Sequence, residues 1–148
     1  MMRFEERYED VLQNLEAGVM RVYRQHPEMT DYDVMDAFAA LRRHYIREAR
    51  QQEPATFNLT ERAQQIFDAV QLMSELRLGR AQMTTDDDAP IKMGELALSV
   101  NEIIDCLKRL ERSVQRWNKS GGRQGYLKYV AEFFPKGKEE TLLLRVKT

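Results

Sequence analysis

Apolar side chains recur every three or four positions along residues 93–117, and this repeat constrains the fold more than any other feature of the chain. It runs through Met93, Leu96, Val100, Ile103, Leu107, Leu110, Val114 and Trp117. Alternating steps of three and four place side chains on one face of an α-helix, as in the heptad seam of packed helices. The repeat predicts a helix over about residues 92–119 that buries this face against other helices.

Three earlier segments carry the same helical periodicity, over about residues 3–26, 31–52 and 59–78. Only 4 Pro and 7 Gly occur in 148 residues, too few for the many turns of a β-sandwich or barrel. We therefore predict one all-α domain, an antiparallel up-down four-helix bundle.

The last segment, residues 124–148, is predicted to form a short appendage on this bundle. Its aromatic and apolar residues fit one face of a fifth helix: Tyr126, Tyr129, Val130, Phe133 and Phe134. The alternation of Leu142, Leu144 and Val146 after the turn at residues 135–138 favours a β-hairpin instead. A docked helix is our prediction, and the hairpin is the alternative.

Composition limits the cellular compartments and the classes of partner that we expect for this chain. The chain has 23 Lys+Arg and 24 Asp+Glu, and this balance excludes a polybasic nucleic-acid binder. Its single cysteine, Cys106, excludes an internal disulfide and a Cys-rich zinc module. Acidic residues follow the first methionines, and no long apolar run occurs. We expect a cytoplasmic protein with no membrane partner.

Charge is nevertheless unevenly distributed, with a net −6 over residues 1–88 and a net +5 over residues 89–148. The cations gather around the end of the fourth predicted helix, at Arg109, Arg112, Arg116, Lys119 and Arg123. Next to aromatic residues, such a strip is typical of nucleic-acid or other polyanion binding. The competing interpretation is a solvated helix end whose cations complement the helix dipole. Arg43, Arg47 and Arg50 repeat the pattern in the second helix, and acids of the first helix would neutralise both groups at a shared pole of the bundle.

Two acidic patterns, Glu5, Glu6 and Glu9 in one and Glu102 and Asp105 in the other, suggest a third reading. Their spacing is similar to that of the magnesium-binding carboxylates of all-α nucleotide pyrophosphohydrolases. That resemblance implies a metal-dependent nucleotide hydrolase. The heptad positions of these acids, however, direct them into solvent along diverging directions, so we predict no catalytic residue, metal or cofactor from them.

Protein–protein interaction, with self-association as one form of it, is the function that the sequence favours. The third and fourth helices carry apolar residues beyond one stripe, including Leu72, Leu98 and Ile104, which a further element or a second subunit would cover. We predict the interface anchors among the tail aromatics: Tyr126, Tyr129, Phe133 and Phe134. Trp117 is expected in the core.

Overall fold

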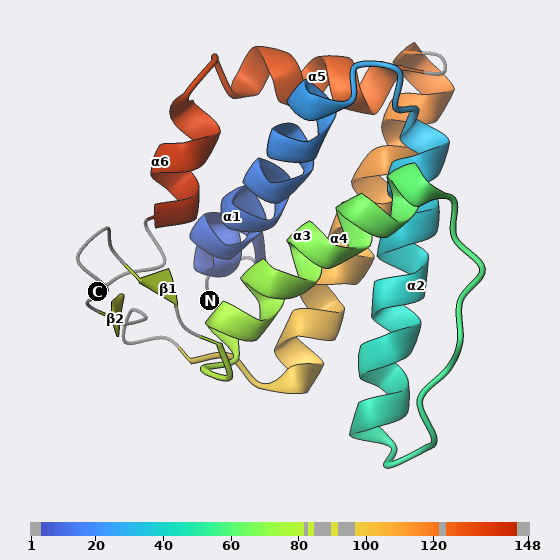
Figure 1. The fold of residues 1–148 in the computed structure, drawn as a ribbon, viewed down its shortest axis with the longest axis vertical. Helices are drawn as coiled ribbons and strands as arrows, with labels where there is room; N and C mark the ends of the chain where they lie inside the picture. Colours follow the sequence, from blue (N-terminus) through green and yellow to red (C-terminus); the bar gives the residue numbers. More distant parts are fainter. Residues whose placement is uncertain (1–3, 82, 85–89, 92–96, 122–123, 145–148) are drawn as a thin grey trace.

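The protein is all-α in a computed structural model that describes residues 4–81, 83–84, 90–91, 97–121 and 124–144. Within these described ranges, six helices pack together (Figure 1). Their bounds are α1, Phe4–Gln25; α2, Asp31–Ala49; α3, Glu61–Arg77; α4, Val100–Gly121; α5, Gly125–Phe133; and α6, Lys138–Leu144. A two-residue antiparallel ladder joins β1, Met83–Thr84, to β2, Pro90–Ile91.

The predicted up-down order of the four long helices is not confirmed, because α2 and α3 run in the same direction. At their beginnings, the hydroxyl of Thr60, the N-cap of α3, donates to the Asp33 carboxylate in the first turn of α2 over 3.2 Å. At their ends, the Tyr45 hydroxyl of α2 donates to Glu75 of α3 over 2.6 Å. Helix α4 runs antiparallel to α2, so the basic ends of these two helices lie at opposite ends of the molecule (Figure 1).

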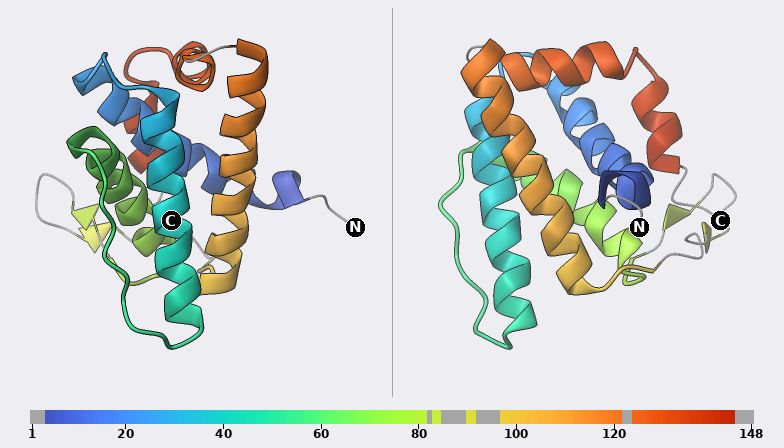
Figure 2. Two further views of the ribbon diagram at one scale, coloured as in Figure 1. Left: turned by 90° about the vertical axis from the view of Figure 1, so that its right-hand side faces the viewer. Right: turned by 180° about the vertical axis from the view of Figure 1, so that it is seen from behind.

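The connection between α2 and α3 explains this arrangement. Residues 50–60 run back along the length of α2 before α3 begins (Figure 2). Eleven extended residues reach at most about 36 Å, and a helix of the length of α2 spans roughly 28 Å, so the connection is long enough for this return. The sequence marks where α2 stops but carries no signal for the direction in which the chain leaves it.

The start of α4 also differs from the sequence prediction. We expected it near residue 92, whereas the helix begins at Val100. Ser99 and Glu102 form a reciprocal cap: the Glu102 N–H donates to the Ser99 hydroxyl over 3.2 Å, and the Ser99 N–H donates to the Glu102 carboxylate over 3.1 Å. This capping box is legible in the sequence and was masked by the apolar repeat. Met93 and Leu96 lie outside the described residues.

The C-terminal appendage consists of two helices. Helix α5 lies across the ends of α1 and α4, and α6 then descends beside α1 (Figures 1 and 2). The predicted fifth helix is thus confirmed, and the described residues 124–144 adopt no β-hairpin. Asn14 of α1 secures α6 by donating to the Leu142 carbonyl, and Arg24 pairs with the buried Glu139 over 3.3 Å.

One apolar core joins the six helices. The described seam of α4 is buried from Ile103 to Val114, and burial raises the pKa of the neighbouring Cys106 thiol to about 12. The surplus apolar residues Leu98 and Ile104 are covered within the same chain, whereas Leu72 is 45% exposed. In the described part of the chain, every helix is too short or too polar to cross a lipid bilayer.

Candidate functional site

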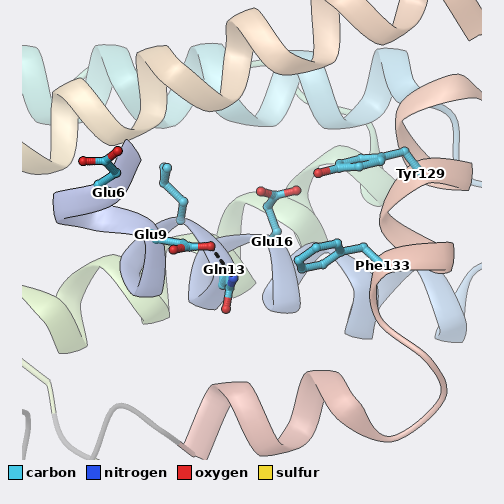
Figure 3. A pocket seen from close by; sticks show the side chains of 7 residues that line it. Glu6, Glu9, Gln13, Glu16, Tyr129 and Phe133 are labelled. Carbon is cyan, nitrogen blue, oxygen red and sulfur yellow. Dashed lines mark hydrogen bonds between the residues drawn. The ribbon is translucent and has the colours of Figure 1, made fainter. Parts of the chain in front are cut away.

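A pocket of about 340 Å³ opens between α1 and α5 (Figure 3). Carboxylate groups and aromatic rings dominate its lining, which consists of Glu6, Glu9, Leu12, Gln13, Glu16, Tyr129 and Phe133. We call this set the acidic–aromatic pocket. It unites two features that the sequence treats separately, the acidic start of the first helix and the aromatic tail.

Helical spacing brings the α1 residues to the pocket. Glu9, Gln13 and Glu16 follow one another at steps of four and three, so they share one face of the helix. The Gln13 amide donates to the Glu9 carboxylate over 3.4 Å, which holds the two side chains together. Glu6 precedes a kink at Tyr8, whose backbone φ and ψ of −115° and 17° are not helical, and the first turn is set at an angle to the rest of α1 (Figure 2).

Glu16 is the least exposed of the three pocket carboxylates. Its Oε2 accepts a hydrogen bond from the Tyr126 hydroxyl over 3.2 Å, and Tyr126 itself is fully buried. Loss of hydration disfavours the ionised form, so burial raises the pKa of Glu16 from 4.5 to about 7, although the bond from Tyr126 partly opposes this shift. Near neutral pH, a cation that entered the pocket would stabilise the ionised carboxylate.

Stacked rings form the opposite wall. Tyr129 stacks on Trp117 with ring centroids 4.7 Å apart, and Phe133 follows at 6.1 Å from Tyr129. Partial burial and the neighbouring Glu16 carboxylate raise the pKa of Tyr129. Phe133 is 44% exposed at the pocket, which makes it one of the few large apolar side chains on the described surface. Aromatic faces beside carboxylates attract cations through the ring quadrupole.

The four aromatic residues predicted as interface anchors separate into two pairs. Tyr129 and Phe133 line the pocket, whereas Tyr126 and Phe134 are both fully buried in the core and have no surface to offer a partner. Successive side chains of a helix point about a hundred degrees apart, so these aromatic residues do not all point in one direction. The sequence alone does not show which face of the helix meets α1. Trp117, expected in the core, is only partly buried beneath Tyr129.

The basic strip on α4 lies apart from this pocket's lining. Arg112, Arg116 and Lys119 are exposed, Arg109 is partly buried, and Arg123 lies outside the described residues. The expected shared pole of the α2 and α4 cations does not form, because α2 runs antiparallel to α4 and their C-terminal ends lie at opposite ends of the molecule (Figure 1). Glu6 and Glu9 line the acidic–aromatic pocket at the end away from Tyr129 and Phe133 (Figure 3).

The acidic patterns that resemble the pyrophosphohydrolase motif are placed on different elements and serve different contacts. Glu102 caps α4 and accepts a hydrogen bond from Tyr8, and Asp105 is exposed on the same helix. Glu6 and Glu9 line the pocket, and the side chain of Glu5 lies outside the described residues. Among the side chains that are described, no three His, Cys, Asp or Glu residues converge as metal ligands would.

A scan against protein-family models, a search of curated proteins and a search of solved structures each find no match to this chain. The chemistry of the pocket is therefore inferred from its own residues.

Proposed function

We propose that the protein is a helical interaction module that holds a lysine or arginine side chain of a partner protein in the acidic–aromatic pocket. One observation carries this proposal: the half-buried Glu16 carboxylate shares the pocket with the exposed ring of Phe133. The buried free thiol of Cys106 supports a reducing, cytoplasmic location for the module.

The electrostatics of the pocket favour a cation over a neutral ligand. Ionising a carboxylate away from water is unfavourable, and a cation at hydrogen-bond distance offsets that cost. Glu6 and Glu9 add negative charge at the more exposed part of the pocket, where they attract a basic segment over a longer range. The methylene groups of a lysine or arginine side chain would contact Leu12 and Phe133, so the lining matches both parts of such a side chain.

The exposure of Phe133 supports a macromolecular partner rather than a free amine. A protein that inserts one basic side chain would also cover this ring, and aromatic residues are enriched among interface anchors. A second copy of the chain is one such partner, because Lys136 in the turn after α5 and Lys138 at the start of α6 are exposed. Self-association through these lysines is then the homomeric form of the same interaction.

The proposal is tested by titrating the protein with a fluorescent lysine-rich peptide and following its anisotropy at low ionic strength. We expect Glu16→Gln and Phe133→Ala each to weaken binding by about tenfold or more, because each removes one of the two features that define the pocket. Glu132→Gln, an exposed site on α5, is the matched control for loss of one charge. Equal affinities for the wild type and all three variants would refute the pocket as the binding site.

The mass of the protein in solution distinguishes a second copy from another partner. If the chain self-associates through the pocket, the oligomer dissociates in the Glu16→Gln variant and in a Lys136→Gln, Lys138→Gln double variant. A monomer at every concentration would exclude a second copy of the chain as the partner. A dimer that resists all of these substitutions would place self-association elsewhere on the surface.

Polyanion binding along α4 is the second candidate, favoured by the exposure of Arg112, Arg116 and Lys119 on one helix. Charged side chains that neutralise phosphates make affinity fall steeply with salt. We expect any nucleic-acid complex of this kind to be lost on combined Arg112→Gln and Arg116→Gln substitution. Absence of a gel shift at low ionic strength would remove this candidate.

A further inference from the structure

A second pocket, of about 350 Å³, lies at the C-terminal end of α2, where the chain turns into residues 50–60. Helix α5 and the acidic–aromatic pocket lie away from this end of α2 (Figure 1). We call it the arginine pocket. Its polar lining consists of Arg43, Arg47, Arg50, Gln52 and Thr56, and Phe57 provides an aromatic wall. No acidic residue lines it.

Helical spacing explains why three arginines line this pocket. Arg43, Arg47 and Arg50 are separated by steps of four and three, so they lie on one face at the end of α2, with Arg50 as its C-cap. Arg47 also donates from Nε to the Glu53 carbonyl, and this hydrogen bond ties the middle guanidinium to the returning loop. Arg43 and Arg50 are exposed and form no ion pair with any described residue.

Capping of the α2 C-terminus does not account for these arginines. The turn itself satisfies the last carbonyls: the Gln52 N–H donates to the Arg47 carbonyl over 2.9 Å, and the Gln51 N–H donates to the Glu48 carbonyl over 3.0 Å. Gln51 adopts a positive φ of 54°, as the residue after a helix does in a Schellman motif. The exposed guanidinium groups of Arg43 and Arg50 are therefore available to a ligand, and Arg47 is held beside them by its Nε hydrogen bond to the loop.

One nearby carboxylate forms an ion pair outside the pocket, and the other, that of the exposed Glu53, is not part of the lining. Glu48, on the same turn of α2, pairs with Arg80 over 2.8 Å, and Arg80 also pairs with Glu75 over 2.9 Å. The pocket thus holds three positive charges, and its lining contains no acidic side chain that would neutralise them. Arginine presents a planar fork that matches the oxygens of a phosphate group.

We propose that the arginine pocket binds a small phosphate monoester, whose dianionic phosphate contacts the guanidinium groups and whose organic part packs on Phe57. A dianion balances more of the threefold positive charge than a single carboxylate does. Phe57 is half-buried with its ring 6.1 Å from that of Phe67, so its position is held by packing while part of it faces the pocket. The concave shape suits one phosphate group rather than an extended backbone.

Isothermal titration calorimetry with phenyl phosphate and with inorganic phosphate tests this proposal. Phenyl phosphate is expected to bind more tightly, because only its ring can contact Phe57. Arg43→Gln and Arg50→Gln should each weaken both probes by about tenfold or more, as expected for loss of a charge-assisted hydrogen bond. Phe57→Leu should weaken phenyl phosphate alone. Arg21→Gln at an exposed site on α1, outside the lining of both pockets, is the charge-matched control.

Three results would overturn the proposal. One is the absence of heat with either probe at about 10 mM, a concentration that would reveal even millimolar affinity. Another is an equal loss of affinity in Arg21→Gln and Arg43→Gln, which would indicate nonspecific charge attraction. A third is an oligonucleotide whose binding depends on Arg43 and Arg50 but is not displaced by phenyl phosphate, because the surface would then serve a polymer.

Discussion

Replacement of Glu16 by glutamine should remove part of the pH dependence of folding stability. Burial raises the pKa of Glu16 from 4.5 to about 7 in the folded protein. Below pH 4.5 the carboxyl is protonated in both the folded and unfolded states, so its ionisation contributes nothing to their difference. Between these two values the folded state binds more protons than the unfolded state, so the free energy of unfolding falls as the pH rises.

The size of this effect follows from the two pKa values. A tenfold change in proton affinity corresponds to about 1.4 kcal/mol, so a pKa of 4.5 in the unfolded chain and about 7 in the folded protein destabilises the folded state by about 3 kcal/mol above pH 7. Glutamine keeps an oxygen that accepts from Tyr126 and carries no ionisable proton. We therefore expect Glu16→Gln to match the wild type near pH 4 and to exceed its stability by up to about 3 kcal/mol near pH 8.

Urea unfolding of both proteins between pH 4 and pH 8 provides the measurement, since the contributions of all other groups cancel in the difference. Glu132→Gln on the surface of α5 controls for the loss of one negative charge. Tyr126→Phe removes the hydrogen bond that favours the carboxylate, so the decline in its stability should continue to a higher pH. A difference between Glu16→Gln and wild type that stays constant across this pH range would refute the assignment of a raised pKa to the half-buried Glu16 carboxylate.

Further predictions concern the backbone and the buried polar contacts. Gly125→Ala should destabilise the protein by about 1–3 kcal/mol in thermal melts, because the new Cβ would lie 2.6 Å from the Trp117 carbonyl oxygen. Gly18→Ala should instead stabilise it by about 0.5–1 kcal/mol, since its nearest contact would be an ordinary 3.5 Å and alanine favours a helix. Gln51→Gly should raise the free energy of unfolding by roughly 0.5–1 kcal/mol by relieving a positive φ. Asn14→Ala should cost about 2–4 kcal/mol in urea, because it leaves a buried guanidinium of α3 and a carbonyl of α6 without this partner. The opposite sign in any of these four measurements would contradict the contact on which it rests.

The site was predictable only in pieces. Aromatic spacing over residues 126–134 identified the helix that carries Tyr129 and Phe133, and the acids of the first helix were recognised as a group. The sequence did not indicate that Glu16 is a site residue. A single glutamate among the apolar residues of a helix cannot be distinguished from a solvated one until the position of the covering helix is known. Its environment depends on α5, which lies 110 residues later in the chain at the Tyr126 contact.

Local sequence determined which segments become helices and where most of them stop. Periodic apolar residues, Thr30 as the N-cap of α2 and the glycine that follows α3 act within a few residues of one another, so they are legible without knowledge of the fold. The direction of α3, the opposite ends of the α2 and α4 cations, and the covering of Glu16 were decided by tertiary packing. Each depends on the course of residues 50–60 or on the docking of α5. Helix periodicity contains no information about either, because a helix has the same periodicity whichever direction it packs in.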